Sequence, residues 1–100
     1  MDASLTFRHD PALRRYIAER AGVQVAFSDV DPVGAGALLI KHSEVLPAEE
    51  NKGYGSALMR YLLDHARAQG KKVIPVCPYA AAFIRKNPQY RDLVKPGFPV

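Results

Sequence analysis

The single cysteine of this sequence is a candidate nucleophile. Cys77 can form no internal disulfide, so it is either a small buried residue or a thiol with a function. Pro78 follows it, and because proline suits the first position of a helix, we expect Cys77 to be the N-cap residue. A thiol at that position lies at the positive end of the helix dipole, which favours the nucleophilic thiolate. An inert cysteine in the core is the alternative.

His42 and Glu44 are candidate proton acceptors. They are two residues apart in a predicted strand, so their side chains share one face of it. Either could accept a proton from an amine or from the Cys77 thiol. A solvated edge histidine and an ordinary surface glutamate remain open as alternatives.

The segment Gly53-Tyr54-Gly55-Ser56 is typical of a loop that holds phosphate. Its glycines permit positive φ and close approach of a ligand, and the first N–H groups of the following helix have no helical partner. Asn51 tolerates left-handed backbone, and Lys52 adds a positive charge. The sequence excludes a Walker loop, which needs Lys followed by Ser or Thr, and Leu58 excludes a dinucleotide fingerprint. A turn that only begins a helix is equally consistent with the local pattern.

These residues lie on a predicted series of strands and helices. Hydrophobic periodicity and turn residues predict, in order, strands Val23–Val30 and Ala35–Val45, helix Ser56–Gln69, strand Lys72–Cys77 and helix Tyr79–Lys86. Asp31–Gly34 is expected to be the hairpin turn, and Leu13–Glu19 stays ambiguous between helix and strand. The strand–helix–strand unit implies a parallel pair with a right-handed crossover. The sequence therefore predicts an α/β (α+β) fold with a mixed, mostly antiparallel sheet.

Length and composition limit the classes of function. A chain of 100 residues with 48% hydrophobic residues is expected to form one domain, residues 1–100, with a modest core. The net charge of +4 suits an anionic ligand, but the basic residues are scattered and mark no nucleic-acid face. The longest apolar run is too short for a membrane span and no secretory signal is evident, so we expect the cytoplasm. No cluster has metal-ligand spacing.

Four segments together resemble the short branch of the GNAT acyltransferase superfamily. They are His42–Val45, Gly53–Leu58, Val73–Tyr79 and Asn87–Tyr90, and the resemblance covers about residues 41–94. The Pro-x-Cys-Pro-Tyr element after the phosphate helix is its specific part. The resemblance implies a GNAT-like fold with a central strand–loop–helix–strand unit that binds acetyl-CoA as co-substrate.

The resemblance also implies where coenzyme A lies. The loop amides would hold the pyrophosphate, and pantetheine would lie between the strand ending near Val45 and the strand ending at Cys77, with N–H groups near Val45 polarising the thioester carbonyl. Pro75 independently limits pairing of those two strands. The residues expected to bind the cofactor are Val45, Asn51, Lys52, Gly53, Tyr54, Gly55, Ser56, Ala57, Tyr79, Phe83 and Lys86.

Alternative roles remain open for three of these residues, and one neighbouring residue departs from the superfamily pattern. Tyr79 and Phe83 are spaced i, i+4, so core packing competes with contact to coenzyme A, and a solvated position competes for Lys86. Glu50 stands where the superfamily usually has Arg or Gln, and Lys52 is close enough in sequence to compensate.

The predicted function is an N-acetyltransferase acting on an unidentified amine, either directly or through an acyl-Cys77 intermediate. The catalytic candidates are Cys77, His42 and Glu44. The alternative is a non-catalytic module that binds coenzyme A or a partner, and a basic nucleic-acid-associated protein is a weaker third hypothesis. We expect a monomer or a homodimer.

Overall fold

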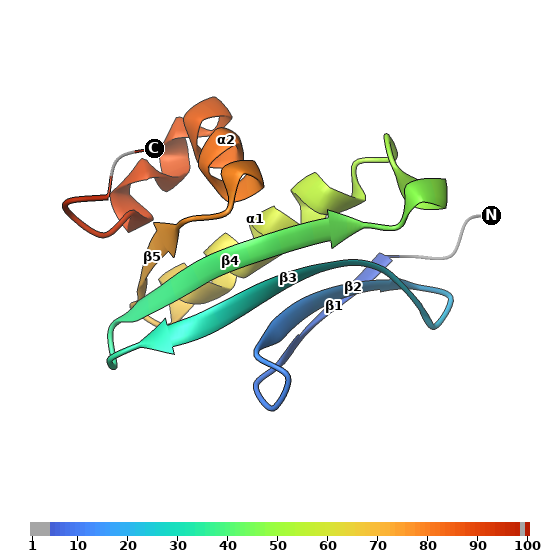
Figure 1. The fold of residues 1–100 in the computed structure, drawn as a ribbon, viewed down its shortest axis with the longest axis horizontal. Helices are drawn as coiled ribbons and strands as arrows, with labels where there is room; N and C mark the ends of the chain where they lie inside the picture. The colour runs from blue at the N-terminus through green and yellow to red at the C-terminus, as the bar shows by residue number, and fades with distance from the viewer. Residues whose placement is uncertain (1–4, 99) are drawn as a thin grey trace.

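The computed structural model describes residues 5–98 and 100, and the described strands form one five-stranded sheet (Figure 1). In chain order the elements are β1 (Leu5–Asp10), β2 (Arg15–Arg20), β3 (Val23–Val33), β4 (Ala37–Val45), the 3₁₀ helix η1 (Pro47–Glu49), α1 (Tyr54–Ala68), β5 (Lys72–Pro75), α2 (Pro78–Lys86) and the 3₁₀ helix η2 (Pro88–Leu93). The sheet order is β1-β2-β3-β4-β5, antiparallel except for the parallel pair β4–β5. The predicted mixed, mostly antiparallel sheet is confirmed.

The structure settles the ambiguous segment and corrects the predicted turn. Arg15–Arg20 is strand β2, paired with β1 and β3. Strand β3 continues three residues beyond the predicted end, and residues 34–36 make the turn, where Gly34 has φ 60°. The cause is pairing with β4, because Asp31, Pro32 and Val33 lie opposite Leu39, Leu38 and Ala37. The Asp31 carboxylate also forms ion pairs with Arg14, in the turn before β2, and with Lys41 on β4. These hydrogen bonds, the one from Lys41 first, lower the pKa of Asp31.

The helices agree with the sequence prediction to within two residues. Helix α1 begins at Tyr54 instead of Ser56 and ends one residue early, and α2 begins at Pro78. Strand β5 ends at Pro75, two residues before the predicted end, because proline has no N–H to continue the ladder.

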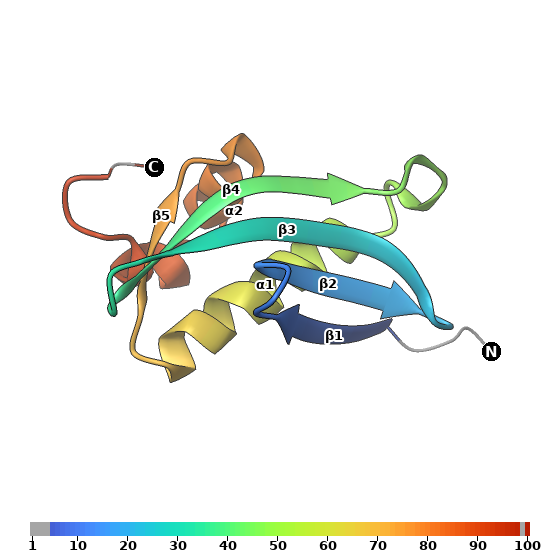
Figure 2. The ribbon, with the colours of Figure 1, turned by 60° about the horizontal axis from the view of Figure 1, so that its bottom comes forward.

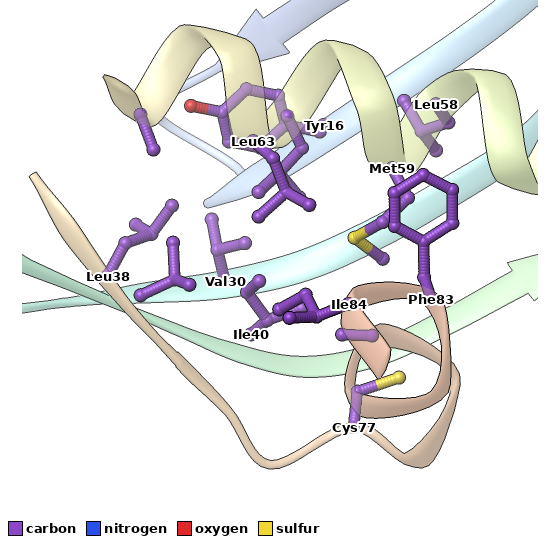
Figure 3. Close-up of a cluster of buried hydrophobic side chains, with 14 of the residues drawn as sticks. Tyr16, Val30, Leu38, Ile40, Leu58, Met59, Leu63, Cys77, Phe83 and Ile84 are labelled. Carbon is purple, nitrogen blue, oxygen red and sulfur yellow. The ribbon is translucent and has the colours of Figure 1, made fainter. Parts of the chain in front are cut away.

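One hydrophobic core joins the sheet to both helices. Helix α1 lies along one face of the twisted sheet (Figure 2) and buries Leu58, Met59, Leu62, Leu63 and Ala66. Helix α2 contributes Ala80, Phe83 and Ile84 to the same cluster (Figure 3). Apolar residues at helical spacing are the reason that each helix packs on one side only. No described helix is long and apolar enough to cross a membrane.

A hydrogen bond of His65 joins α1 to the sheet. His65 lies on α1, and its Nδ1 is 2.5 Å from the hydroxyl oxygen of Tyr16 on β2. His9 on β1 stacks on the Tyr16 ring, with 4.3 Å between ring centroids. Burial raises the pKa of Tyr16 to about 12, so its hydroxyl is protonated and the bond fastens α1 to the sheet.

The strands β4 and β5 separate halfway along β4, which creates the space for a site. They pair only from Ala37 opposite Lys72 to Ile40 opposite Pro75. Beyond that point β4 runs on to Val45, whereas the chain after β5 turns into α2 (Figure 1). Among the described residues, the last backbone hydrogen bond between β4 and the chain after β5 runs from the Cys77 N–H to the Ile40 carbonyl at 2.9 Å.

Candidate active site

A cavity of about 520 Å³ lies where the far half of β4 faces the start of α1. Its wall is built from the first half of β3, the end of β4, the segment from η1 to α1, the start of α1 and one residue of α2. The lining residues are Ala26, Phe27, Ser28, Ser43, Glu44, Val45, Glu49, Glu50, Asn51, Gly53, Tyr54, Gly55, Ser56, Leu58 and Tyr79. The glycine loop and the polar end of β4, which are separate in the sequence, therefore face one space.

The glycine loop presents the N-terminus of α1 to this cavity. Asn51 and Gly53 have φ of 65° and 82°, the left-handed conformations that their residue types permit. No side chain caps the helix, and its first intrahelical bond runs from the Ala57 N–H to the Gly53 carbonyl at 3.0 Å. The preceding amides of the first turn have no helical acceptor, so they can bind an anion.

Tyr79 of α2 covers this helix N-terminus from the side. Its hydroxyl lies 3.1 Å from the Ser56 Oγ, and the side chain is 40% exposed. A Cβ on Gly55 would lie 2.8 Å from the Tyr79 hydroxyl and 3.1 Å from a methyl group of Val45. Only glycine leaves room here, which places Val45, Gly55, Ser56 and Tyr79 together at one end of the cavity.

Cys77 is the N-cap residue of α2, as predicted, but its side chain makes no capping hydrogen bond. It is 3% exposed, lies at the margin of the core beside Ile84 (Figure 3), and does not belong to the cavity wall. The thiol donates instead to the Ser43 Oγ at 3.6 Å. The thiol is therefore connected to the cavity through one side chain.

Ser28 and Ser43 are polar residues of the cavity wall that the sequence analysis missed. Their hydroxyl oxygens are 2.7 Å apart, and Ser28 is 1% exposed. The sequence pattern does indicate that Ser28 is buried, because it lies between Ala26 and Val30 at an inward-facing position of a strand. A polar residue at such a position must find a hydrogen-bond partner.

His42 and Glu44 share one face of β4, as predicted, and form a close pair. The His42 Nε2 is 2.6 Å from a Glu44 carboxylate oxygen, and both side chains are exposed. Glu44 lines the cavity, whereas His42 does not. A carboxylate at the cavity with an imidazole behind it can accept a proton and pass it to solvent.

The remaining expected residues fall into two groups. Asn51, Gly53, Tyr54, Gly55, Ser56, Val45 and Tyr79 line the cavity, whereas Lys52, Ala57, Phe83 and Lys86 do not. Phe83 is buried in the core, 6.0 Å from the Tyr90 ring between centroids, and Lys86 is exposed in the last turn of α2.

The charges around the cavity are mostly negative. Glu44, Glu49 and Glu50 all belong to its wall. Lys52 pairs with Glu49 at 2.8 Å, and this hydrogen bond raises the pKa of the lysine. The expected compensation of Glu50 by Lys52 is therefore not the arrangement found. No group of three potential metal ligands occurs within residues 5–98 and 100.

Comparison with known proteins gives a family match and several structural neighbours. A protein-family model described as GCN5-related N-acetyl-transferase matches residues 15–93. No curated protein matches the sequence. A GCN5-like protein from Staphylococcus aureus is 20% identical with a TM-score of 0.67, over 94% of this chain and 89% of that chain.

Two longer proteins contain a similar fold. Ard1 from Thermoplasma volcanium is 26% identical with a TM-score of 0.54, over 60% of this chain and 41% of that chain. The N-acetylglutamate synthase from Neisseria gonorrhoeae, solved with coenzyme A and N-acetyl-glutamate, is 18% identical with a TM-score of 0.59, over 73% of this chain and 25% of that chain. This chain matches less than half the length of these two proteins.

Proposed function

Because this chain belongs to the GCN5-related N-acetyltransferase family, we propose that it takes the acetyl group of acetyl-CoA and transfers it to an amine. The same proposal places it in the short branch that carries the Pro-x-Cys-Pro-Tyr element, here Pro75–Tyr79. The observation that carries the proposal is the cavity itself, which extends from an uncapped helix N-terminus to the polar end of β4.

Each part of the site fits a part of acetyl-CoA. The first-turn amides of α1, which no side chain caps and which follow the open position at Gly53, suit the pyrophosphate. The gap that opens beyond Ile40 and Pro75 suits the pantetheine chain. The acyl end would then lie near Ser43 and Glu44, which line the cavity beyond this gap.

Direct transfer is the first of two routes. Acetyl-CoA supplies an activated thioester. The amine nitrogen bonds to the acetyl carbon as the carbon–sulfur bond breaks, and the departing sulfur is released as the thiol. Glu44, with His42 behind it, is the base that takes the proton from the amine nitrogen, and this proton is the one that the departing sulfur gains. The position of Glu44 in the cavity wall supports this role.

The second route passes through an acyl-Cys77 intermediate. The observation in its favour is the thiol at the N-terminus of α2, one hydrogen bond from the cavity. In this route the Cys77 sulfur bonds to the acetyl carbon as the bond from that carbon to the CoA sulfur breaks, and the Cys77 proton goes to the departing CoA sulfur. The amine then takes the acetyl group, and its proton returns to the Cys77 sulfur. A 3% exposed sulfur outside the cavity wall would have to turn past Ser43 first, and this favours the direct route.

The first experiment measures turnover and the fate of Cys77 together. The protein is incubated with acetyl-CoA and a panel of amines, namely amino acids, polyamines and peptides with free N-termini. Mass spectrometry follows acetylated products, and intact-protein spectra follow acetylation of Cys77. We expect release of free thiol with at least one amine, and a large loss of rate in Glu44→Gln but not in Glu19→Gln, a matched carboxylate on β2 that pairs with Arg8.

Three outcomes separate the hypotheses. Binding of CoA without turnover on any amine would favour the non-catalytic module. Acetylated Cys77 that disappears when amine is added would favour the second route. Absence of CoA binding at millimolar concentration would contradict the whole proposal.

A further inference from the structure

Three side chains form a short hydrogen-bonded series that leads from the core to the cavity. The Cys77 thiol donates to the Ser43 Oγ at 3.6 Å, and the Ser28 and Ser43 oxygens are 2.7 Å apart. The members come from α2, β4 and β3, so the series joins three elements at one point. Of the three, Ser43 is the one that is both in the cavity wall and only partly buried.

The difference in burial between the two serines favours one direction for their hydrogen bond. A serine hydroxyl has one hydrogen to donate and two lone pairs to accept. Ser28 is 1% exposed, and its hydroxyl makes its one hydrogen bond within the described residues to Ser43. Either oxygen could donate in this bond, and we assign Ser28 as the donor because its buried hydrogen needs an acceptor, whereas the partly exposed Ser43 can reach the cavity. Cys77 also donates to Ser43, and both lone pairs of Ser43 are then occupied.

The hydrogen of the Ser43 hydroxyl is the group that remains without a partner in this series. Neither bond on Ser43 uses it, and Ser43 borders the cavity. The space open to this hydrogen is the cavity that Ser43 borders. Two fixed donors therefore orient one hydroxyl as a donor toward whatever lies there.

We propose that Ser43 is a catalytic residue whose hydroxyl donates to the carbonyl oxygen of the thioester, with Ser28 and Cys77 as the positioning residues that aim it. This inference rests on the proposed acetyl transfer. The carbonyl oxygen gains negative charge as the amine adds, so a donor held in place beforehand stabilises the transition state more than the bound substrate. No proton leaves Ser43 in this step.

This assignment gives Cys77 a role different from that of a nucleophile. The thiol acts as a hydrogen-bond donor and keeps its proton. A serine at position 77 keeps a donor of similar size, whereas an alanine removes it. Cys77→Ser therefore retains most of the activity, and Cys77→Ala loses a measurable part of it. A nucleophilic thiol predicts a large loss in both variants.

Kinetics of acetyl transfer test the assignment. We expect Ser43→Ala to lower kcat on the order of 10²-fold with little change in KM for acetyl-CoA, the loss typical of one oxyanion donor. Ser43→Thr keeps the hydroxyl and should keep most of the rate, and Ser28→Ala should lose less than Ser43→Ala. Thr6→Ala, which removes an exposed strand hydroxyl bonded to the Glu19 carbonyl, is the matched control. If Ser43→Ala does not fold, the double variant Ser28→Ala/Ser43→Ala, which orphans no hydroxyl, replaces it.

An infrared measurement tests the hydrogen bond without turnover. Acetyl-CoA labelled with ¹³C at the carbonyl is bound to wild type and to each variant, and the carbonyl stretch is isolated as a difference spectrum. We expect a lower frequency in wild type and Ser43→Thr than in Ser43→Ala. Bound acetyl-CoA with the same frequency and kcat in wild type and Ser43→Ala would overturn this inference alone. Acetylated Cys77 together with an inactive Cys77→Ser would also overturn it, whereas absence of binding to wild type would overturn the proposed function with it.

Discussion

Position 55 must be glycine because of its close contacts with Tyr79 and Val45 at the site. It lies in the first turn of α1, where alanine would normally be the better helix former. Here an added methyl group meets the Tyr79 hydroxyl and Val45 at 2.8 and 3.1 Å. The sign of the effect on stability therefore depends on a contact with α2 and not on helix propensity.

We predict that Gly55→Ala lowers the free energy of unfolding by about 1–2 kcal/mol, as overpacking does. In a Tyr79→Phe background, which removes the nearest atom, the penalty should shrink. Gly36→Ala is the matched control, because nothing lies within 4 Å of its added Cβ. Urea denaturation of the four variants measures these differences. Equal penalties in both backgrounds would show that the Tyr79 hydroxyl is not the obstacle.

The sequence predicted those features of the site that depend on neighbouring residues in the chain. It did not predict the hydrogen bonds that depend on how strands pair. Pro78 identified Cys77 as an N-cap residue, and the glycines identified the helix start. The link from Cys77 to Ser43 depends on the register of β4 against β5 and α2. The link from Ser43 to Ser28 depends on strand register next to an irregularity at Asp29 and Val30. A periodic pattern in one strand contains neither piece of information.

At the scale of elements, contacts between strands determined two assignments that the local sequence did not, namely the end of β3 and the identity of β2. The sequence Asp31-Pro32-Val33-Gly34 predicts a turn, yet its first three residues pair with β4 and belong to β3, where the Asp31 carboxylate also meets Arg14 and Lys41. The ambiguous segment became β2 because β1 and β3 flank it on both sides. Helix α1 was predicted well because its apolar residues follow one long stripe.

The contact between β1 and α1 makes stability depend on pH. Burial, the nearby His65 and then Lys71 lower the pKa of His9 from 6.5, and Asp10 opposes them. The unfolded chain then binds the His9 proton more readily than the folded protein does. Stability is therefore greatest above the unfolded value and falls as the pH decreases through about 6.5.

We predict that the melting temperature falls between about pH 7.5 and pH 5.5, and that His9→Phe flattens this dependence. Phenylalanine keeps an aromatic ring against Tyr16, whose ring centroid lies 4.3 Å from that of His9, and removes the titrating group. Calorimetry across this range measures both slopes. An unchanged slope in His9→Phe would assign the dependence to other groups.

At the scale of the whole molecule, a chain of 100 residues has a modest core, so a bound ligand adds noticeably to stability. The cavity of about 520 Å³ separates α1 and β4 at one end, where ligand contacts would replace missing packing. We predict that CoA at roughly 100 times its Kd adds about 2.7 kcal/mol to the free energy of unfolding, seen as a raised melting temperature. Adenosine at equal concentration is the control, because it lacks the pyrophosphate that the loop amides would bind. Equal shifts with both ligands would place recognition away from the loop.

The early end of β5 at Pro75 gives the molecule an internal sheet edge. From Lys41 to Val45, β4 has β3 on one side and, among the described residues, no strand on the other. Backbone amides of this stretch that face the gap exchange their hydrogens with solvent as those of an outer strand would, although the stretch lies inside the fold. An extended chain with its own amide groups can lie in this gap and act as a temporary sixth strand, and those hydrogens then become protected. Because Pro75 ends β5 early, this edge of β4 remains free to form hydrogen bonds with a ligand that has amide groups.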